Sequence, residues 1–493
     1  MPESYLNLRS TEEWPGVWWL PDRPDKQVPG TLHYAPNGTL TLTLIGGFED
    51  GLFDPEIEGR ITSHDERTSW KAIWGAVRNQ ELTILDCISV ASQRRLSSAP
   101  NTPERQTILA TSALIGSHTH NENETVFSQC EISVENLNQW AASPAFTFSW
   151  ELLSDDRPNG HGGIEVAPPE EPSVDIHHAK WTLAHVLTLP TIDYFRGSTV
   201  ARTSETAIVR VTPDQPCTLN DALRFTRLLQ DLVSLATHRA AGVIWLRLTI
   251  PAARSSEDNN FHILNRDVNV LYSPARVGID NEKEVEPHRV FFTCQDLPFT
   301  TIMPRWIELH ERLLAASNII LGLRYAPAEY VENNLLTIVS AAEVLHRELK
   351  LGKQPIPNEA FKTMRDSMLD QIPNKHHPRP KGNIRNKSTL RERLHDIVNL
   401  LDPSVVAELI PDVKTWARNT AIARNSLAHE GKTPGKPPEE LMAIVNSTTA
   451  ILLFVVLDNL GLSTQKQRKV ARDHPNFRAI AQQSQKWLSD PRG

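Results

Sequence analysis

The sequence has little of what marks secreted, membrane or metal-binding proteins. Its 493 residues include only four cysteines, which lie far apart and form no Cys-x-x-Cys pair. This excludes a zinc ribbon and a disulfide framework, and we expect no metal and no cofactor. The longest apolar run, Ala450 to Leu457, is far shorter than the ~20 residues that span a bilayer. Met1 to Ser10 carries no apolar signal core, so we expect a soluble, cytoplasmic protein.

The chain also lacks a general excess of basic charge. Its formal net charge is -8, which argues against a surface built for bulk nucleic-acid binding. A nucleic-acid site would therefore have to be a local basic patch. The stretch Gly431-Lys432-Thr433 lacks the upstream glycine of a P-loop, because position 426 is Ser, so it indicates no nucleotide site.

The first 295 residues are rich in short alternating segments that predict strands. Thr39 to Leu44 alternates Thr and Leu directly after Asn37-Gly38, which is a hairpin signal. Leu219 to Arg239 has the apolar spacing of one helix, capped by Thr218 or Asn220. A segment near 155–175 has the composition of a loop, and this half of the chain could divide there into two sheets. Further strands are expected at 72–75, 82–85, 107–114, 145–150, 207–211 and 243–250.

Beyond Pro304 the pattern becomes helical, and we assign residues 300–462 to an all-α bundle. Residues 463–493 form a polar tail in which Phe477, Ile480 and Trp487 allow one weakly amphipathic helix. The predicted fold class is therefore α+β multidomain, with a β-rich N-terminal domain (1–295) followed by the bundle. The expected helical segments are Trp306 to Gly322, Tyr330 to Leu351, Leu390 to Leu401, Ser404 to Glu430 and Pro438 to Leu462.

The motif Arg424-Asn425-x-x-x-His429, followed by Gly431, carries the most chemistry. Arginine holds a phosphate through its planar fork, and histidine moves a proton near neutral pH. Cutting RNA requires these two abilities if the ribose 2'-OH is the nucleophile. Arg424 shares a helix face with packed residues, so it needs a carboxylate, a helix end or a phosphate as partner. His429 lies roughly 140° further round an ideal helix. The helix must distort, or two copies must pair so that both motifs line one groove; we favour a homodimer.

Two further clusters are candidates for a supporting role. Glu343 and His346 lie on an apolar helix, where Glu343 could pair with Arg424, and His346 is otherwise a satisfied core histidine. A basic segment has seven Lys and Arg residues against one acid, Glu392, and is either a solvated linker or an RNA-binding loop. Its basic residues are Lys375, Arg379, Lys381, Arg385, Lys387, Arg391 and Arg393.

These motifs resemble those of the ApeA-like HEPN proteins, a family of anti-phage proteins. The resemblance in the helical half rests on the Ala-Ala-Glu helix around Glu343, the Arg-Glu-Arg-Leu around Arg393, and the Arg424/Asn425/His429 motif. The N-terminal half is similar to the ApeA N-terminal domain at Trp14-Pro15-Gly16-Val17-Trp18-Trp19 and at Gly116-Ser117-His118.

The resemblance implies an abortive-infection endoribonuclease that is metal-independent. Arg424 would stabilise the phosphate, Asn425 would position its neighbours, and His429 would act as general acid or base. The implied partners are RNA, with tRNA as first guess, a phage-derived trigger, and a second copy of the chain through the HEPN domain. The β-rich half would be the sensor that restrains the nuclease.

Two other readings stay open from the sequence. One is a non-catalytic HEPN module that binds RNA or protein through the same residues. The other, less favoured, is a carbohydrate-active N-terminal domain that uses Glu49 and Asp50 near Trp74. The tryptophans Trp14, Trp18 and Trp19 either bind a phage ligand or pack in the core, and core packing is the preferred interpretation.

Overall fold

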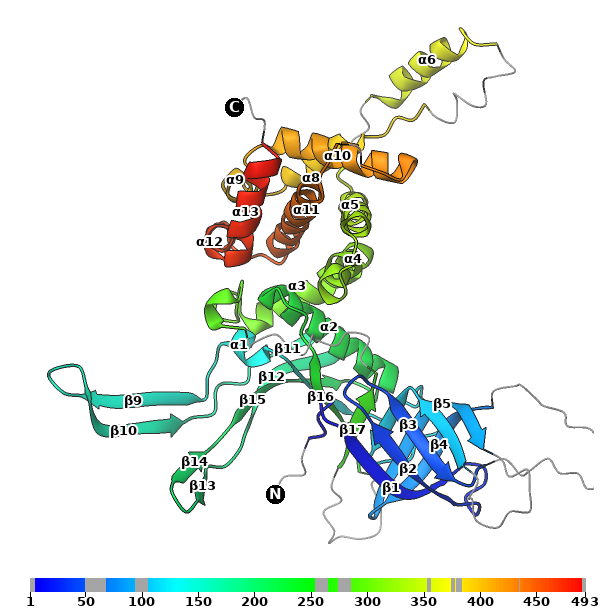
Figure 1. Cartoon of the computed structure of the whole chain (residues 1–493), viewed down its shortest axis with the longest axis vertical. Helices are drawn as coiled ribbons and strands as arrows, with labels where there is room; N and C mark the ends of the chain where they lie inside the picture. The colour runs from blue at the N-terminus through cyan, green and yellow to red at the C-terminus, as the bar shows by residue number, and fades with distance from the viewer. Residues whose placement is uncertain are drawn as a thin grey trace, which may run out of the picture. The chain divides into compact units, whose positions relative to one another are not determined.

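The computed structural model describes residues 5–48, 68–93, 105–252, 265–273, 285–352, 356–373, 377, 384–433 and 435–489 (Figure 1). The chain divides into two compact units. The first comprises the residues up to 236 together with 240–285 and 293–295. The second comprises 237–239, 286–292 and the chain from 296 onward.

The first unit begins with a closed barrel. β5 is a 14-residue strand that pairs with β4 up to Ile88 and with β6 from Ile88 to Gln93. Because β6 also pairs with β3, the order β5-β4-β1-β2-β3-β6 returns to β5 and leaves no open edge there. The strands are β1 (Glu12–Trp19), β2 (Val28–Tyr34), β3 (Leu40–Ile45), β4 (Ser69–Val77), β5 (Gln80–Gln93) and β6 (Arg105–Ala110).

Alternating side chains and one large aromatic ring fill this barrel. In β3 the three leucines are buried and the threonines between them are partly exposed, as the sequence pattern predicted. Trp18 is fully buried, and a Cβ on Gly75 would lie 2.5 Å from its ring, so only glycine fits at that position. Trp14 is also buried, which confirms core packing for these two tryptophans. Trp19 is partly buried and meets His118 edge-on at 5.4 Å.

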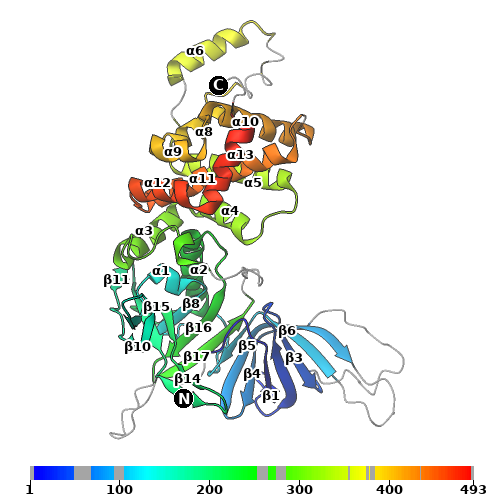
Figure 2. The ribbon, with the colours of Figure 1, turned by 60° about the vertical axis from the view of Figure 1, so that its left-hand side comes forward.

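The sheet continues from the barrel into an open sheet backed by a helix (Figure 2). Phe225 of α2 meets Trp181 of β12 edge-on at 5.4 Å. Thr218 starts α2: its hydroxyl accepts the N–H of Asp221 at 3.1 Å, and the Asp221 carboxylate accepts the N–H of Thr218 at 3.1 Å. The helix predicted from the sequence is confirmed as α2 (Leu219–Thr237). From the barrel strand β5 the sheet continues, in this order, with β7 (Ser112–Ile115), β17 (Arg266–Tyr272), β16 (Val243–Ile250), β8 (Gln129–Val134), β15 (Glu205–Pro213), β12 (Ala179–Leu187) and β11 (Ser173–Ile176).

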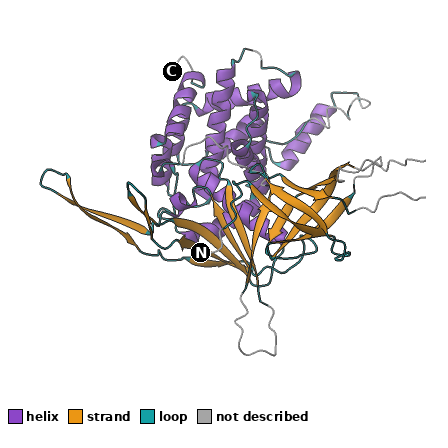
Figure 3. Ribbon diagram, turned by 60° about the horizontal axis from the view of Figure 1, so that its bottom comes forward, coloured by secondary structure: helices purple, strands orange, loops and turns teal. Residues whose placement is uncertain are grey.

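Two β-ribbons project from this unit (Figure 3). β9 (Phe146–Leu152) pairs with β10 (Pro158–Val166), and β13 (Thr191–Tyr194) pairs with β14 (Thr199–Arg202). β10 occupies part of the segment that the sequence predicted as a loop; Gly160, Gly162 and Gly163 gave it the composition of a turn. The expected strand at 107–114 is two strands, β6 and β7.

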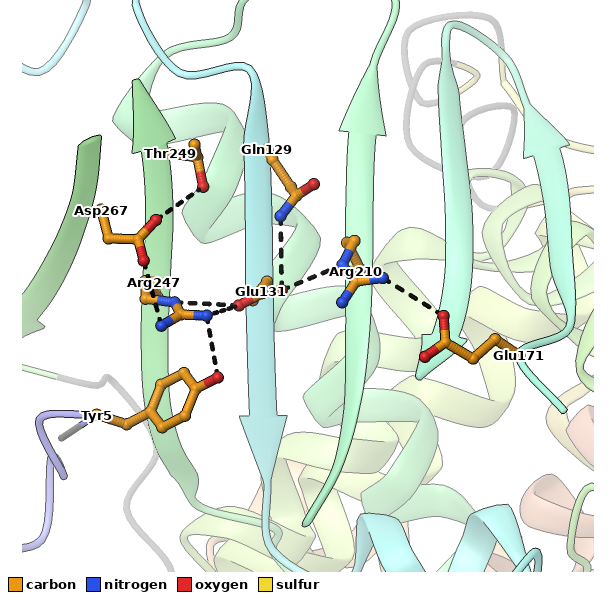
Figure 4. Close-up of polar contacts among 8 residues, drawn as sticks. All are labelled: Tyr5, Gln129, Glu131, Glu171, Arg210, Arg247, Thr249 and Asp267. Atoms are coloured by element: carbon orange, nitrogen blue, oxygen red, sulfur yellow. Dashed lines mark hydrogen bonds and ion pairs between the residues drawn. The ribbon is translucent and has the colours of Figure 1, made fainter. Parts of the chain in front are cut away.

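The face of the open sheet opposite its apolar core carries a charged cluster (Figure 4). Glu131 of β8 is 5% exposed and lies between two arginines on the neighbouring strands. Its carboxylate accepts hydrogen bonds from Arg210 at 3.1 Å and from Arg247 at 3.0 Å. The Arg247 guanidinium also lies over the ring of Tyr5, 4.2 Å from its centroid.

The second unit is helical among its described residues. Most of its helices pack around α11, in which most side chains are buried. α11 is the one described helix long and apolar enough to cross a membrane, but 78% of its most apolar stretch is buried, as in a core helix. The helices are α3 (Phe299–Arg312), α4 (Leu314–Tyr325), α5 (Val331–Glu348), α6 (Asn358–Leu369), α8 (Leu390–Val398), α9 (Pro403–Leu409), α10 (Val413–Glu430), α11 (Pro438–Asn459), α12 (Thr464–Asp473) and α13 (Pro475–Trp487).

The helices differ from the prediction in four places. The first expected segment is two helices, because the chain turns at the buried Leu313. The fourth is also two helices, because Pro411 separates α9 from α10. The expected polar tail folds as α12 and α13, with Phe477 fully buried. α6 was not predicted at all.

Candidate active site

The helix α10 carries the Arg424 motif and has defined ends. At its start, the Asp412 carboxylate accepts the backbone N–H of Thr415 at 3.0 Å. At its end, Gly431 adopts a left-handed conformation, with φ 68°, and its N–H bonds to the carbonyl of Leu427 at 3.1 Å. The glycine stop expected from the sequence is therefore present, and His429 lies in the last turn.

Glu343 of α5 holds two arginines from two other helices. Its Oε2 accepts a hydrogen bond from Nη2 of Arg424 at 3.0 Å, and its Oε1 accepts one from Nη1 of Arg393 at 2.8 Å. Arg393 also donates through Nε to the carbonyl of Ser388 at 3.1 Å. The pairing of Glu343 with Arg424 that the sequence suggested is thus present. Through these bonds Glu343 links α5, α8 and α10, which lie close together in Figure 1.

This cluster has an excess of positive charge within reach of solvent. Two guanidinium groups share one carboxylate, and their side chains are 29% (Arg424) and 26% (Arg393) exposed. Arginine favours bidentate contacts with carboxylate and phosphate oxygens alike. A phosphodiester could therefore exchange with the carboxylate or add to the cluster from the solvent side.

A second polar side-chain contact lies one helical turn away on the same two helices. His346 of α5 is 6% exposed, and its Nε2 lies 2.9 Å from Oδ2 of Asp396 of α8. Glu343 and His346 are three residues apart on α5, and Arg393 and Asp396 are three residues apart on α8. In the first contact the acidic residue is on α5, and in the second it is on α8. His346 is therefore a buried histidine with a partner, and it stiffens the contact that places Glu343.

His429 and Asn425 lie on the exposed side of α10. Asn425 accepts a hydrogen bond from Nη1 of Arg424 at 3.2 Å through its side-chain carbonyl. His429 is exposed, and on the regular helix it lies roughly 140° round and ~7.5 Å along from Arg424. The helix does not distort to bring the two together. Arg418, Ile422, Asn425 and His429 instead form one exposed stripe at i, i+4, i+7 and i+11.

The basic segment is described in part. Lys375, Arg379 and Lys381 lie outside the described residues. Arg385, Lys387 and Arg391 are exposed before and at the start of α8. Arg393, assigned from the sequence to RNA binding, is instead within the Glu343 cluster.

The start of α8 is fixed by a reciprocal cap. The Thr389 hydroxyl accepts the backbone N–H of Glu392 at 3.3 Å, and the Glu392 carboxylate accepts the backbone N–H of Thr389 at 2.7 Å. The backbone N–H and the hydroxyl of Thr389 hold the pKa of Glu392 below its usual range. The one acid of the basic segment is therefore used as a cap.

The remaining candidates of the sequence do not assemble into a site among the described residues. Glu49 and Asp50 lie outside them. Trp74 stacks on His118 at 4.8 Å and donates to the carbonyl of Thr119 at 2.7 Å, so its ring is engaged in packing. Within the described ranges no group of three His, Cys, Asp or Glu side chains is placed to hold a metal ion.

Asp396 is the residue of this region that sequence reasoning missed. The sequence does contain a matching pattern: a basic and an acidic residue, Arg393 and Asp396, have the same three-residue spacing as Glu343 and His346. Recognising it would have required knowing that α5 and α8 pack side by side.

The fold and this cluster define a two-unit protein with a β-barrel domain and a helical domain that carries two partly exposed arginines on one carboxylate. Comparison with known families identifies it further: the model of ApeA N-terminal domain 1 matches residues 13–306, and that of the Apea-like HEPN domain matches residues 336–466. The chain therefore belongs to the ApeA family, as its motifs suggested. HEPN domains are typically ribonucleases, which supports a nuclease of the antiviral-defence type. No curated protein and no solved structure matches the chain.

Proposed function

We propose that this protein is an anti-phage abortive-infection effector whose helical unit is a metal-independent endoribonuclease. The observation that carries the proposal is the sharing of one carboxylate, Glu343, by Arg393 and Arg424. An anion site with surplus positive charge, beside an exposed histidine on the same helix, supplies the groups that RNA cleavage needs.

The reaction is transfer of the phosphodiester to its own ribose. The 2'-oxygen attacks phosphorus and loses its proton to a base, while the 5'-oxygen leaves with a proton from an acid. His429 serves as acid or base, and Arg424 neutralises the charge that develops on the phosphate oxygens. Asn425 orients the Arg424 guanidinium through the hydrogen bond described above. The products carry 2',3'-cyclic phosphate and 5'-hydroxyl ends.

The active form is a homodimer or higher homo-oligomer through the HEPN domain. Within one chain His429 lies too far round α10 to meet the phosphate held at Arg424. The exposed stripe that carries His429 also presents Ile422, which is 50% exposed and suited to burial against a second copy. Pairing of two α10 helices places His429 of one copy near Arg424 of the other.

The substrate is RNA held in part by the basic residues near α8, and tRNA is the first choice. Anticodon loops present unpaired, flexible phosphodiesters, which basic side chains can grip. The β-rich unit is the sensor that keeps the nuclease inactive until a phage-derived trigger binds. The protein acts in the cytoplasm, where tRNA and the trigger are both present.

The proposal is tested by sequencing RNA 5'-hydroxyl ends from cells that carry the protein, with and without phage. New ends at defined sites are expected in infected cells, and Arg424→Ala and His429→Ala should abolish them. Arg468→Ala and His288→Ala are matched controls, because both side chains are exposed elsewhere on this unit. Protection of cells without any new RNA end would rule out cleavage.

A non-catalytic HEPN module that binds RNA or protein is the second candidate. The observation in its favour is the separation of His429 from Arg424 within one chain. A binding module would retain RNA affinity and phage protection in His429→Ala. A nuclease of the proposed kind would bind RNA in that variant but lose protection.

A further inference from the structure

A second cluster of polar side chains lies in the β-rich unit, whereas Arg424 belongs to the helical unit. The Oγ of Ser143 lies 3.2 Å from Nε2 of His185, and Nδ1 of the same ring lies 2.6 Å from Oε1 of Glu205. A hydroxyl, an imidazole and a carboxylate thus stand in series. This is the order of groups in enzymes that use an activated serine.

The carboxylate and the imidazole are buried, and backbone contacts fix the carboxylate. The side chain of His185 is 2% exposed and that of Glu205 is 7% exposed. The second oxygen of Glu205 accepts the backbone N–H of Ala145 at 2.9 Å. The Nδ1–H bond of His185 does not point directly at Oε1, so the two groups are in close polar contact without an aligned hydrogen bond. Catalytic hydrogen bonds are often misaligned without substrate.

The three residues come from elements that the sheet holds in register. His185 on β12 is paired with Ala207 on β15, and Glu205 begins β15. Asn138 of α1 (Leu137–Ala141) accepts the N–H of Ala207 at 2.9 Å, which ties the helix before Ser143 to the same strand. Ser143 is partly buried, whereas the side chains of His185 and Glu205 are almost fully buried. A substrate would therefore have to approach the three residues from the Ser143 end.

We propose that Ser143, His185 and Glu205 form a serine acyl-hydrolase site. Ser143 Oγ attacks a carbonyl carbon and gives its proton to Nε2 of His185, while Glu205 stabilises the resulting imidazolium. The bond from the carbonyl carbon to the leaving group breaks, and the leaving group takes the proton from His185. Water then attacks the Ser143 ester, again losing a proton to His185, and releases a carboxylic acid and free Ser143.

The surroundings favour an ester or amide whose acyl part is apolar. β9 begins three residues after Ser143, and its alternate residues Phe146, Phe148 and Trp150 lie on one face of the ribbon. Register places Ile164 of β10 opposite Phe148 on that face. Phe148 is 67% exposed and Trp150 is 63% exposed. This apolar strip leads away from the serine and would bind an acyl chain or an apolar peptide side chain.

The test uses the full chain and a fluorophosphonate probe, with the modified residue located by peptide mass spectrometry. Hydrolysis of p-nitrophenyl butyrate is followed in parallel. We expect the probe on Ser143, and a labelling rate lowered roughly 100-fold in His185→Gln, since general-base help contributes about that much or more. Ser149→Ala is the matched control, because Ser149 is an exposed serine on β9; it should label as the unchanged chain does.

The outcomes distinguish a reactive serine from a hydrogen-bonded cluster that only stabilises the fold. Absence of the probe from Ser143 in the unchanged, folded chain would overturn the proposal, without any variant being needed. Equal labelling in the unchanged chain and His185→Gln would do the same, because the serine would then react without its base. Glu205→Gln, which keeps the shape of the side chain, should slow labelling while circular dichroism shows that the fold is intact.

Discussion

The Nη2 of Arg424 donates a hydrogen bond at 3.0 Å to the carboxylate of Glu343, across 81 residues of chain. The same carboxylate binds Arg393, so removing its charge leaves two cations without their shared anion. Glu343 therefore both positions Arg424 and competes with a phosphate for it. Substitutions at Glu343 can tell which of these effects is larger.

Glu343→Gln is expected to strengthen RNA binding about fivefold to tenfold, because roughly 1 kcal/mol of competing attraction is removed. The measurement is made in the His429→Ala background, so that the RNA stays uncut during titration. Glu408→Gln is the control, since Glu408 pairs with Arg468 on another part of the unit. Weaker binding in Glu343→Gln would show that positioning of Arg424 outweighs competition.

The proposed dimer makes a sharp prediction for mixed oligomers. If Arg424 of one copy acts with His429 of the other, a dimer of Arg424→Ala and His429→Ala chains keeps one complete site. Co-expression of the two inactive variants in equal amounts should then restore about a quarter of the cleavage, as counted by RNA 5'-hydroxyl ends, because about half of the dimers are mixed and each of these has one complete site of two. Each variant alone should stay inactive. If co-expression restores nothing although mixed dimers are isolated through two different tags, the two residues act within one chain.

Lys387 and Arg391 should contribute to RNA affinity mainly through phosphate. Each alanine substitution is expected to lower the slope of log affinity against log salt by about 0.7, the value for one phosphate contact on a single strand. The slope is measured by fluorescence anisotropy in the His429→Ala background. Arg468→Ala removes the same charge elsewhere and should leave the slope unchanged. An unchanged slope for Lys387→Ala and Arg391→Ala would assign this segment to a solvated linker.

Local patterns predicted many of the elements and part of the candidate site. The Asn37-Gly38 turn with its alternating Thr and Leu residues gave β3, and the caps at Thr218 and Gly431 correctly marked the ends of helices. These features depend on neighbours in the sequence, where turn and cap chemistry are decisive. The Glu343–Arg424 pair was predicted because an arginine on the packed face of a helix needs an anionic partner.

The features that were missed depend on contacts between distant segments. The break between α3 and α4 falls at Leu313, a buried apolar residue that continues the helical pattern and gives no stop signal. Closure of the barrel depends on β5 changing partner from β7 to β6 along its length, which no local pattern encodes. Asp396 similarly needs the packing of α8 on α5. Tertiary contact, rather than propensity, determines each of these.

The charged cluster around Glu131 predicts a large effect from one substitution. Glu131→Ala removes the carboxylate that both Arg210 and Arg247 contact in the sheet. Because each arginine is partly exposed and keeps a second carboxylate (Glu171 or Asp267), we expect a loss of about 2 kcal/mol in the free energy of unfolding of this unit. Denaturant titration followed by tryptophan fluorescence measures it. Glu171→Ala is the control, because Glu171 is 45% exposed and 3.5 Å from Arg210. A loss below 0.5 kcal/mol, roughly that expected of the control, would show that the cluster adds little stability.

Acid should destabilise the helical unit through His238. Burial, followed by the positive charges of Arg324 and His474, holds the pKa of His238 well below its usual value. Arg324 lies against the ring, with Nη2 3.0 Å from Nδ1. His238 therefore stays neutral in the folded protein, while in the unfolded chain it binds a proton below its ordinary pKa of about 6.5. Wherever the unfolded state binds more protons, stability rises with pH, so stability is lost as the pH falls below that value.

For His238 alone, the free energy of unfolding is expected to change by up to about 1.4 kcal/mol per pH unit. His474 adds to this change, because its pKa is also lowered, mainly by burial. Thermal unfolding of the full chain between pH 7.5 and 5.5 measures it. His238→Asn is the informative variant, because asparagine does not titrate and tolerates the positive φ of 54° at this position. His178→Asn is the control, since His178 is 96% exposed. Stability should fall less steeply with acid in His238→Asn than in the control, and equal slopes would show that the burial of His238 does not limit the stability of this unit in acid.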